Sequence, residues 1–150
     1  MPMRFVHTNI AAQDWNKLAQ FYINVFGCTI KPPERRLSGE WLDKGTGLRD
    51  AKLEGVHLRL PGFDNNGPTL EIFTYSEMKT SDEVTANKTG FTHIAFEVDD
   101  VATTLELALN NGATKLGEIT GKHIEGAGDL TFVYFRDPEG NIVEIQSWDK

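Results

Sequence analysis

The sequence predicts a single α+β domain over residues 1–150, made of two similar modules with the element order β-α-β-β-β. Two short strings support this prediction, because each occurs twice in the same order along the chain. FVH at residues 5–7 returns as FTH at 91–93, and LEI at 70–72 returns as VEI at 143–145. A third observation is that one helix-like segment follows the first strand in each half. Repeated strings in equivalent elements indicate an internal repeat.

The first module, residues 1–76, is expected to begin with a strand at residues 4–11, which is rich in β-branched and aromatic residues. A helix should follow over residues 15–26, where apolar side chains recur at three- and four-residue spacing. Asp14 is the expected N-cap of this helix, and Gly27 is its C-terminal stop. The other expected segments are strands at 28–32, 52–60 and 69–75, an end or bend at Pro32-Pro33, and an irregular or part-helical excursion at 34–50.

A polar linker at residues 77–89 leads to the second module, residues 90–150, in which the same order returns. Asp99 or Asp100 should cap a helix that ends near Asn111. The other expected segments are strands at 90–98, 114–119, 130–136 and 141–148, a glycine-rich loop at 121–128 and a turn at 137–141.

Charge and composition argue against several classes of function. The chain has 150 residues and a formal net charge of −7. An acidic chain is a poor partner for nucleic acid or for anionic membrane surfaces, since both attract clustered Lys and Arg. The apolar runs are too short to span a bilayer, and the N-terminus lacks a secretory pattern. Cys28 is the sole cysteine, which excludes an internal disulfide and favours a cytoplasmic location.

Four of the predicted strands carry one histidine or glutamate near the middle of a mixed face. Side chains alternate across a strand, so each of these strands also has an apolar face suited to packing beneath a helix. The residues on the mixed faces are His7, Glu71, His93 and Glu144. Two imidazoles and two carboxylates related by a repeat predict a site for a divalent ion such as Zn, Ni, Co, Fe or Mn. A carboxylate would be costly to bury without such a cation.

Other candidate side chains receive structural interpretations. No repeat partner supports His57 or His123, and a lone histidine in a strand is usually structural. Cys28 is expected to be a small core residue, because no base can be placed beside it. Glu97 shares a face with His93 and is expected at a solvated rim.

The sequence resembles the vicinal oxygen chelate superfamily, which includes glyoxalase I, methylmalonyl-CoA epimerase, fosfomycin resistance proteins, extradiol dioxygenases and bleomycin resistance proteins. The segments that carry the resemblance span nearly the whole chain: FVHTNIAAQDWNKLAQFYINVFG, TLEIFTY, GFTHIAFEVDDV and FRDPEGNIVEIQ. In this family, paired βαβββ modules curl into an open, cup-shaped barrel of mixed sheet around a metal ion. The strings FYINVFG and DPEGNIVEI are typical of the superfamily and do not specify one reaction.

The resemblance implies that the metal ligands are His7, Glu71, His93 and Glu144, a set most like that of bacterial glyoxalase I. It implies a lyase or isomerase that stabilises an enediolate or enolate next to a carbonyl, with Glu71 or Glu144 as the base. One alternative is an Fe(II) extradiol-type dioxygenase, a class that does not use a glutamate at the position of Glu71. Another is a small-molecule binding or resistance protein that has no catalytic activity.

Two departures from the glyoxalase I pattern bear on the substrate. Ala11 stands where an arginine that binds glutathione is common, and Tyr75 stands where an asparagine is usual. A glutathione adduct is therefore not the expected substrate. Phe73, Tyr75 and Trp148 lie on the ligand-bearing faces and are expected to line a more aromatic pocket for a small molecule. The resemblance also implies a homodimer.

Overall fold

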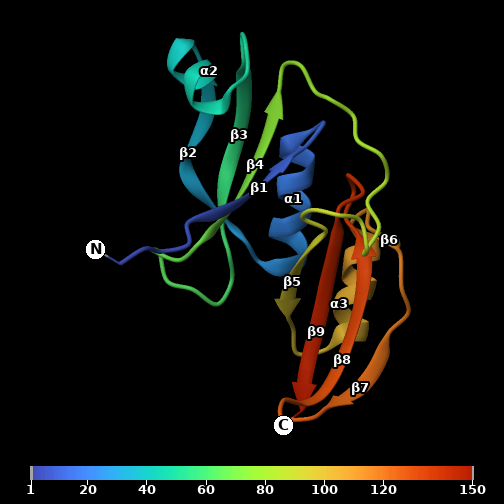
Figure 1. Cartoon of the computed structure of the whole chain (residues 1–150). Helices are drawn as coiled ribbons and strands as arrows, with labels where there is room; N and C mark the ends of the chain where they lie inside the picture. The colour runs from blue at the N-terminus through green and yellow to red at the C-terminus, as the bar shows by residue number, and fades with distance from the viewer. Residues whose placement is uncertain (1, 150) are drawn as a thin grey trace. The chain divides into compact units, whose positions relative to one another are not determined.

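The computed structural model describes residues 2–149 of the chain. The chain folds into two compact units, the first ending at Thr80 and the second beginning at Ser81. Each unit contains one mixed β-sheet with a helix against it (Figure 1). The α+β fold class predicted from the sequence is therefore confirmed.

The first unit contains four strands and two helices. Its elements are β1 (His7–Ala11), α1 (Trp15–Phe26), β2 (Thr29–Ser38), α2 (Glu40–Thr46), β3 (Lys52–Arg59) and β4 (Thr69–Tyr75). The strand order is β1-β4-β3-β2. The pairing of β1 with β4 is parallel, and the other two pairings are antiparallel.

The described part of the second unit has a similar sheet with one additional strand and a single helix, so α2 has no counterpart there. Its elements are β5 (His93–Glu97), α3 (Val101–Asn110), β6 (Thr114–Lys115), β7 (Thr120–Ile124), β8 (Gly128–Arg136) and β9 (Ile142–Asp149). The strand order is β5-β9-β8-β6, and β7 also pairs with β8. As in the first unit, the first and last strands pair in parallel.

The apolar faces of the strands form the core beneath the helices, as the alternating pattern predicts. In the first unit α1 lies against β3 and β4, and in the second α3 lies against β8 and β9 (Figure 1). The strand residues that are almost fully buried are Val56, Leu58, Leu70, Ile72, Val133, Phe135, Val143 and Ile145. Helix α1 contributes Leu18 and Tyr22 to the core, and α3 contributes Val101 and Ala108.

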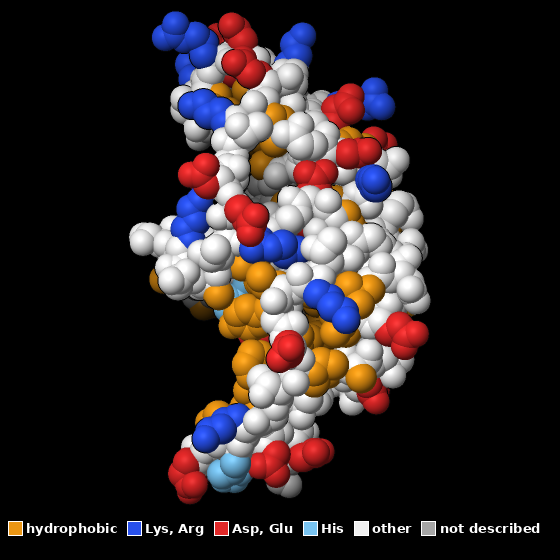
Figure 2. All heavy atoms as spheres, turned by 90° about the vertical axis from the view of Figure 1, so that its right-hand side faces the viewer, with side chains coloured by type: hydrophobic (Ala, Val, Ile, Leu, Met, Phe, Trp, Pro, Cys, Tyr) orange, Lys and Arg blue, Asp and Glu red, His pale blue; other side chains and the backbone are white. Residues whose placement is uncertain are grey.

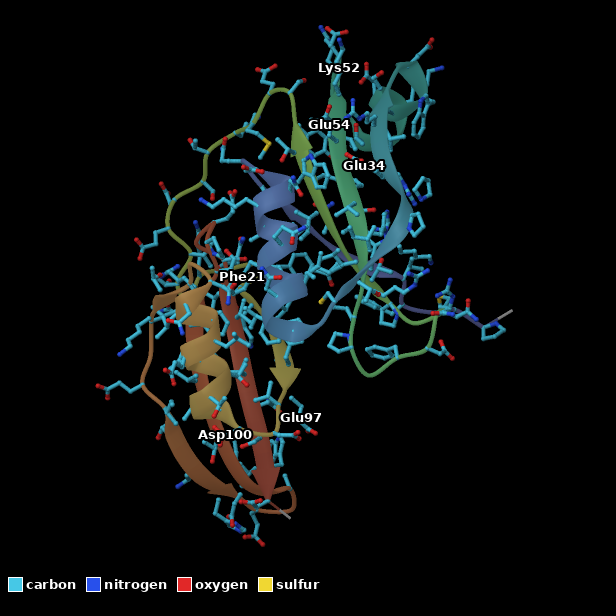
Figure 3. The ribbon with its side chains drawn as sticks, turned by 180° about the vertical axis from the view of Figure 1, so that it is seen from behind. Phe21, Glu34, Lys52, Glu54, Glu97 and Asp100 are labelled. Atoms are coloured by element: carbon cyan, nitrogen blue, oxygen red, sulfur yellow. The ribbon has the colours of Figure 1, made fainter. Side chains whose placement is uncertain are left out.

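The helix ends follow the signals in the sequence. The Asp14 side chain accepts a hydrogen bond from the backbone N–H of Lys17 at 3.1 Å, and Gly27 adopts a left-handed conformation (φ 71°) after the last turn of α1. The Asp100 carboxylate caps α3 in the same way, accepting from the N–H of Thr103 at 2.8 Å (Figure 3). These caps fix where each crossover helix begins.

The second strand runs further than the sequence predicted. It was expected to end or bend at Pro32-Pro33, whereas β2 continues to Ser38. The pairing of β2 with β3 shifts register between Lys31 and Arg35, and this irregularity accommodates the two prolines, which have no N–H to donate. The excursion predicted at 34–50 is therefore strand at its start, with α2 following.

Two expectations for the second unit are also wrong in part. The segment 121–128 was expected to be a loop, but β7 occupies residues 120–124 and pairs with β8. The strand expected at 114–119 is limited to the two residues of β6. The DPEGN turn forms as predicted, with Asp137 accepting hydrogen bonds from the backbone N–H groups of Glu139 and Asn141.

Surface charge is mixed on the face shown in Figure 2. Lysine and arginine side chains are scattered there among aspartates and glutamates. Over the full sequence, 22 aspartates and glutamates outnumber 15 lysines and arginines, which gives the net charge of −7. In the part of the chain that the structure describes, no helix has the length and apolar character needed to cross a membrane.

Gly55 should be intolerant of a side chain, because the neighbouring strand lies close to its backbone. A Cβ at Gly55 would collide with the carbonyl oxygen of Ile72 and lie 2.6 Å from Cδ1 of Phe73. We expect Gly55→Ala to lower the free energy of unfolding by about 1–3 kcal/mol in chemical denaturation. Gly45→Ala in α2 is the control, since nothing lies within 4 Å of its Cβ. Equal stability of the two variants would contradict this account.

Candidate metal centre

The first histidine–glutamate pair lies on two parallel strands of the first unit. His7 begins β1, and Glu71 lies on β4 opposite Asn9. Nε2 of His7 is 3.4 Å from Oε1 of Glu71. The Asn9 amide donates to the same carboxylate oxygen at 2.8 Å. Because the Glu71 side chain is only 11% exposed, these neighbours supply much of the polar environment of its carboxylate.

His57 joins this pair from the neighbouring strand β3. Its register places it directly opposite Glu71, and its Nε2 lies 2.7 Å from Oε2 of that residue. Its other ring nitrogen, Nδ1, is 3.2 Å from the hydroxyl oxygen of Thr69. One potential ligand atom from each of His7, His57 and Glu71 lies within 4.8 Å of the others. These three residues are called the first-unit cluster below.

Sequence reasoning missed His57 because no histidine stands at the equivalent place in the second module. The alternation of apolar and polar side chains along residues 52–60 nevertheless contained a signal for His57. Val56 and Leu58 are fully buried on the helix-covered face, so His57 must point to the opposite face. That is the face on which Glu71 of the adjacent strand also lies.

The second histidine–glutamate pair has the same strand positions in the second unit. His93 begins β5, and Glu144 lies on β9 opposite Ala95. Nε2 of His93 is 3.3 Å from Oε1 of Glu144, whose side chain is 11% exposed. The sequence predicted that each histidine shares a sheet face with the glutamate of its own module. Both units show such a close pair.

A hydrogen-bonded chain of three residues along β9 orients the Glu144 carboxylate. The Trp148 indole donates to Oε1 of Gln146 at 2.6 Å, and the Gln146 amide nitrogen donates to Oε2 of Glu144 at 2.8 Å. An indole N–H can only donate, so it holds the oxygen of the Gln146 amide. The amide nitrogen must then face the carboxylate.

Tyr134 takes the place in the second unit that His57 takes in the first. It lies opposite Glu144 in the β8–β9 register, as His57 lies opposite Glu71. Its ring centroid is 4.7 Å from that of His93. Burial raises the pKa of the Tyr134 phenol, and the negative charge of Glu144 raises it further. Tyr134 is therefore a protonated phenol near neutral pH, which makes it a weaker metal donor than an imidazole.

The imidazole of His57 favours its neutral form. Burial lowers the pKa of His57 below its ordinary value, and the positive charge of Arg35 acts in the same direction. The charge of Glu71 opposes this effect by stabilising the imidazolium, but the net direction is downward. A neutral imidazole has a free nitrogen lone pair, which is the form that binds a metal.

The aromatic residues expected to line a pocket have different surroundings. Phe73 is buried, packs with a cluster of Leu42, Ala51 and Leu53, and lies with its ring centroid 6.1 Å from that of His57. Tyr75 packs against this cluster and lines an open hollow of about 410 Å³. Lys52 and Glu54, which are two residues apart on β3 (Figure 3), line the same hollow. A substrate role for these aromatic side chains and for Trp148 stays a prediction.

The remaining sequence candidates lie apart from the pairs. His123 is 65% exposed and contacts Asp129 on the neighbouring strand at 2.7 Å. Cys28 is buried, as expected for a core residue, and burial raises the pKa of its thiol to about 11. Little reactive thiolate is therefore present at neutral pH.

The titration of His57 should respond to Glu71 in a defined direction. In the metal-free protein, NMR of the ring protons should show His57 titrating below 6.5, and Glu71→Gln should lower its pKa further because the carboxylate charge is lost. The stabilising contribution of neutral His57 is present above 6.5 and is lost as the pH falls through the folded pKa. His57→Gln assigns the signal, and a rise of the pKa in Glu71→Gln would contradict the prediction.

Comparison with known proteins places the chain in a family. Residues 4–145 match the model described as Glyoxalase/Bleomycin resistance protein/Dioxygenase superfamily. No curated protein sequence matches the chain. Among solved structures, a glyoxalase family protein from Bacillus cereus is 18% identical, with a TM-score of 0.74 over 99% of this chain and 94% of that one.

Two further structures share the fold. A glyoxalase family protein from Enterococcus faecalis is 18% identical, with a TM-score of 0.60 over 95% of this chain and 96% of that one. The fosfomycin resistance protein FosX from Listeria monocytogenes was solved as a mutant with Mn(II) and 1S,2S-dihydroxypropylphosphonic acid. It is 18% identical, with a TM-score of 0.56 over 97% of this chain and 92% of that one. Because the family model covers most of the sequence, the chain belongs to the Glyoxalase/Bleomycin resistance protein/Dioxygenase superfamily.

Proposed function

We propose that this protein is a metal-dependent lyase or isomerase that moves a proton next to a carbonyl of a small oxygenated substrate. The proposed metal ligands are His7, Glu71, His93 and Glu144. The observation that carries the proposal is the recurrence of one geometry in both units. In each, a histidine Nε2 lies 3.3–3.4 Å from an oxygen of a largely buried glutamate.

The chemistry of these residues fits a divalent ion. Imidazole nitrogen combined with carboxylate oxygen suits Zn, Ni, Co, Mn or Fe, and a buried carboxylate is costly without a cation or strong donors. Each glutamate also accepts a hydrogen bond from a neutral amide, Asn9 for Glu71 and Gln146 for Glu144. Such partners orient metal-binding carboxylates in proteins. The Mn(II) found with FosX supports the proposal by analogy of fold.

The proposed reaction divides the work between the ion and the glutamates. A divalent ion supplies a Lewis acid that stabilises negative charge on the substrate oxygen when the neighbouring carbon loses its proton. The product of that proton loss is an enolate or enediolate of the substrate. A carboxylate close to the reacting carbon takes the proton and later returns it.

Of the two candidate bases, Glu144 is better placed to accept a proton than Glu71. Both oxygens of Glu71 have close partners, the Asn9 amide at 2.8 Å and His57 Nε2 at 2.7 Å. A carboxylate with a close partner on each oxygen is less free to turn an oxygen toward a substrate carbon. Glu144 has the Gln146 amide at 2.8 Å, whereas its other oxygen faces His93 at the longer distance of 3.3 Å. We therefore assign proton transfer to Glu144 and a holding role to Glu71.

The proposed substrate is small and carries an apolar or aromatic substituent. Ala11 stands opposite Phe73 in the register of β1 with β4, so this part of the sheet presents a methyl group and a phenyl ring. Neither residue offers a positive charge for the carboxylates of glutathione. Tyr75 and Trp148 are proposed to add aromatic surface to the substrate site. The proposal also includes a homodimer and a cytoplasmic location.

Metal binding is the first test. We expect untagged protein to bind about one equivalent of Zn, Ni or Co by isothermal titration and elemental analysis, and His93→Ala to weaken binding at least about 100-fold, because a ligand is lost. His123→Ala is the matched control, since that exposed histidine pairs with Asp129 instead. Wild-type protein without metal affinity, or a His93→Ala variant that binds normally, would contradict the ligand assignment.

Proton exchange tests the reaction itself. In D₂O, NMR should show loss of the signal of the proton next to the carbonyl in some members of a panel of small 2-hydroxy aldehydes and ketones. Glu144→Gln should slow this exchange by about 10²–10⁴-fold, the usual share of a general base. Metal content of each variant separates loss of the base from loss of the ion. An unchanged exchange rate in metal-loaded Glu144→Gln would show that another residue is the base. Glu71→Gln is the matched comparison, because it makes the same change in the carboxylate that is assigned to hold the ion.

A dimer is expected in solution. Light scattering coupled to size-exclusion chromatography should give twice the chain mass of 16.8 kDa. A mass equal to that of a single chain across the accessible concentration range would contradict the homodimer.

A further inference from the structure

We propose that His57 is a metal ligand and that the first-unit cluster of His7, His57 and Glu71 holds a divalent ion without help from His93 and Glu144. This inference rests on the proposed metal dependence of the protein and adds a residue to it. It also predicts that the two units contribute unequally, with the first unit binding the ion more tightly.

The spacing of the donor atoms fits one ion. Ligands bound at about 2.0–2.1 Å to a tetrahedral or octahedral ion lie roughly 2.9–3.4 Å from one another. The His57 Nε2–Glu71 Oε2 distance is 2.7 Å and the His7 Nε2–Glu71 Oε1 distance is 3.4 Å. The rings of His7 and His57 meet edge to face with centroids 5.5 Å apart. Both Nε2 atoms thus approach the same carboxylate, one at each of its oxygens.

The groups behind the ligands support this assignment. A metal-binding histidine typically donates its second ring N–H to an oxygen, which fixes the tautomer and leaves the other nitrogen free to bind. Nδ1 of His57 lies 3.2 Å from the hydroxyl of Thr69, a residue that is only 4% exposed. The Asn9 amide holds Glu71 from the side of the carboxylate that faces β1. When an ion replaces the proton that Nε2 of His57 shares with Glu71 in the metal-free protein, Nδ1–H is the donor that faces the Thr69 hydroxyl. His57 and Glu71 then each have an outer partner.

The scaffold beneath the cluster is rigid. Its members lie on β1, β3 and β4, which are three adjacent strands of one sheet with β4 in the centre. Glu71 pairs directly with His57 on one side and with Asn9 on the other. Sites on paired strands are held more accurately than sites on loops. The backbone already places one donor atom of each residue within 4.8 Å of the others.

The three side chains of the first-unit cluster differ in solvent exposure, and the difference suits the binding of an ion from solvent. The side chains of Glu71 and His57 are 11% and 14% exposed, whereas that of His7 is 37% exposed. An ion could therefore reach the donors from the side of His7. The remaining coordination positions would then be available to water or to oxygens of the substrate.

Among the residues that the structure describes in the second unit, no imidazole or carboxylate stands at the place of His57. The position opposite Glu144 belongs to Tyr134, and the position corresponding to Asn9 is Ala95. A protonated phenol replaces an imidazole, so the second unit offers two strong ligands where the first offers three. Two imidazoles and a carboxylate from one rigid sheet should bind a borderline divalent ion more tightly than one imidazole and one carboxylate.

Removal of the second pair from the full-length chain tests this inference directly. We expect His93→Ala/Glu144→Gln to retain one equivalent of Co(II), bound more weakly than in wild type because two ligands are lost, with visible absorption bands and measurable affinity in isothermal titration. Adding His57→Gln to that background should weaken Co(II) binding at least about 100-fold. Adding His123→Gln, which removes an exposed histidine that contacts Asp129, should leave the affinity within about twofold.

A conservative variant tests the contribution of Thr69, the residue beside Nδ1 of His57. Thr69→Val keeps the shape of the side chain and removes the hydroxyl beside Nδ1 of His57. It should weaken Co(II) binding in the same background by about 10–100-fold. Circular dichroism and thermal unfolding of each metal-free variant show whether a loss of affinity reflects a loss of fold.

An NMR experiment on wild-type protein tests the inference without any change at His57. Long-range ¹H–¹⁵N spectra of the histidine rings report on each nitrogen. Saturation with Zn(II) should shift Nε2 of His57 from the protonated, pyrrole-like position expected beside the Glu71 carboxylate to a metal-bound position. An unchanged His57 Nε2 signal in the Zn(II)-saturated protein would overturn the assignment.

The outcomes separate this inference from the proposed function. If wild type binds Co(II) but the His93→Ala/Glu144→Gln background does not, the four-ligand proposal stands and the independent first-unit site is wrong. If that background binds and His57→Gln leaves its affinity unchanged, His57 is not a ligand. If His93→Ala alone has no effect while His57→Gln abolishes binding, the first-unit cluster is right and the four-ligand set is wrong. Wild-type protein that binds no divalent ion would overturn both.

Discussion

Parallel pairing between the first and last strands of each unit is the constraint on which the candidate site depends. This pairing places Glu71 of β4 beside β1 and Glu144 of β9 beside β5. Each glutamate then lies within 3.4 Å of a histidine nitrogen. Parallel strands cannot be joined by a tight turn and need a crossover, which α1 and α3 provide. The apolar faces that these helices cover then leave the opposite faces to carry polar groups. Placement of the donors and burial of the core are thus two results of one strand topology.

The fold and the two histidine–glutamate pairs could be predicted because they follow local patterns that repeat. Alternation along a strand determines which side chains share a face, and the FVH/FTH and LEI/VEI strings mark equivalent strands. His57 could not be found in this way, because its contact with Glu71 comes from the lateral register of β3 with β4. Strand β7 and the extension of β2 were missed for a related reason. Both depend on a partner strand more than on their own glycine- or proline-containing sequences.

The two units share a backbone plan but surround their glutamates with different chemistry. Glu71 is contacted by the Asn9 amide and the His57 imidazole. Glu144 is contacted by the Gln146 amide and lies opposite the Tyr134 phenol on the neighbouring strand. Internal repeats allow such divergence, because each copy keeps the geometry while neighbouring positions on β3 and β8 change independently. Under the proposed function, this difference in surroundings is what separates a carboxylate that holds an ion from one that transfers a proton.

The link from Trp148 through Gln146 to Glu144 gives the protein an intrinsic optical sensor. The indole N–H is hydrogen-bonded to an amide that is itself hydrogen-bonded to the carboxylate, at 2.6 Å and 2.8 Å. Any change in the charge or position of Glu144 alters the dipole that the indole experiences. Indole emission responds to such local fields, so fluorescence of Trp148 can follow the state of this carboxylate in real time. With Trp15 and Trp41 replaced by phenylalanine, the chain would carry its own single-residue reporter at the C-terminal strand.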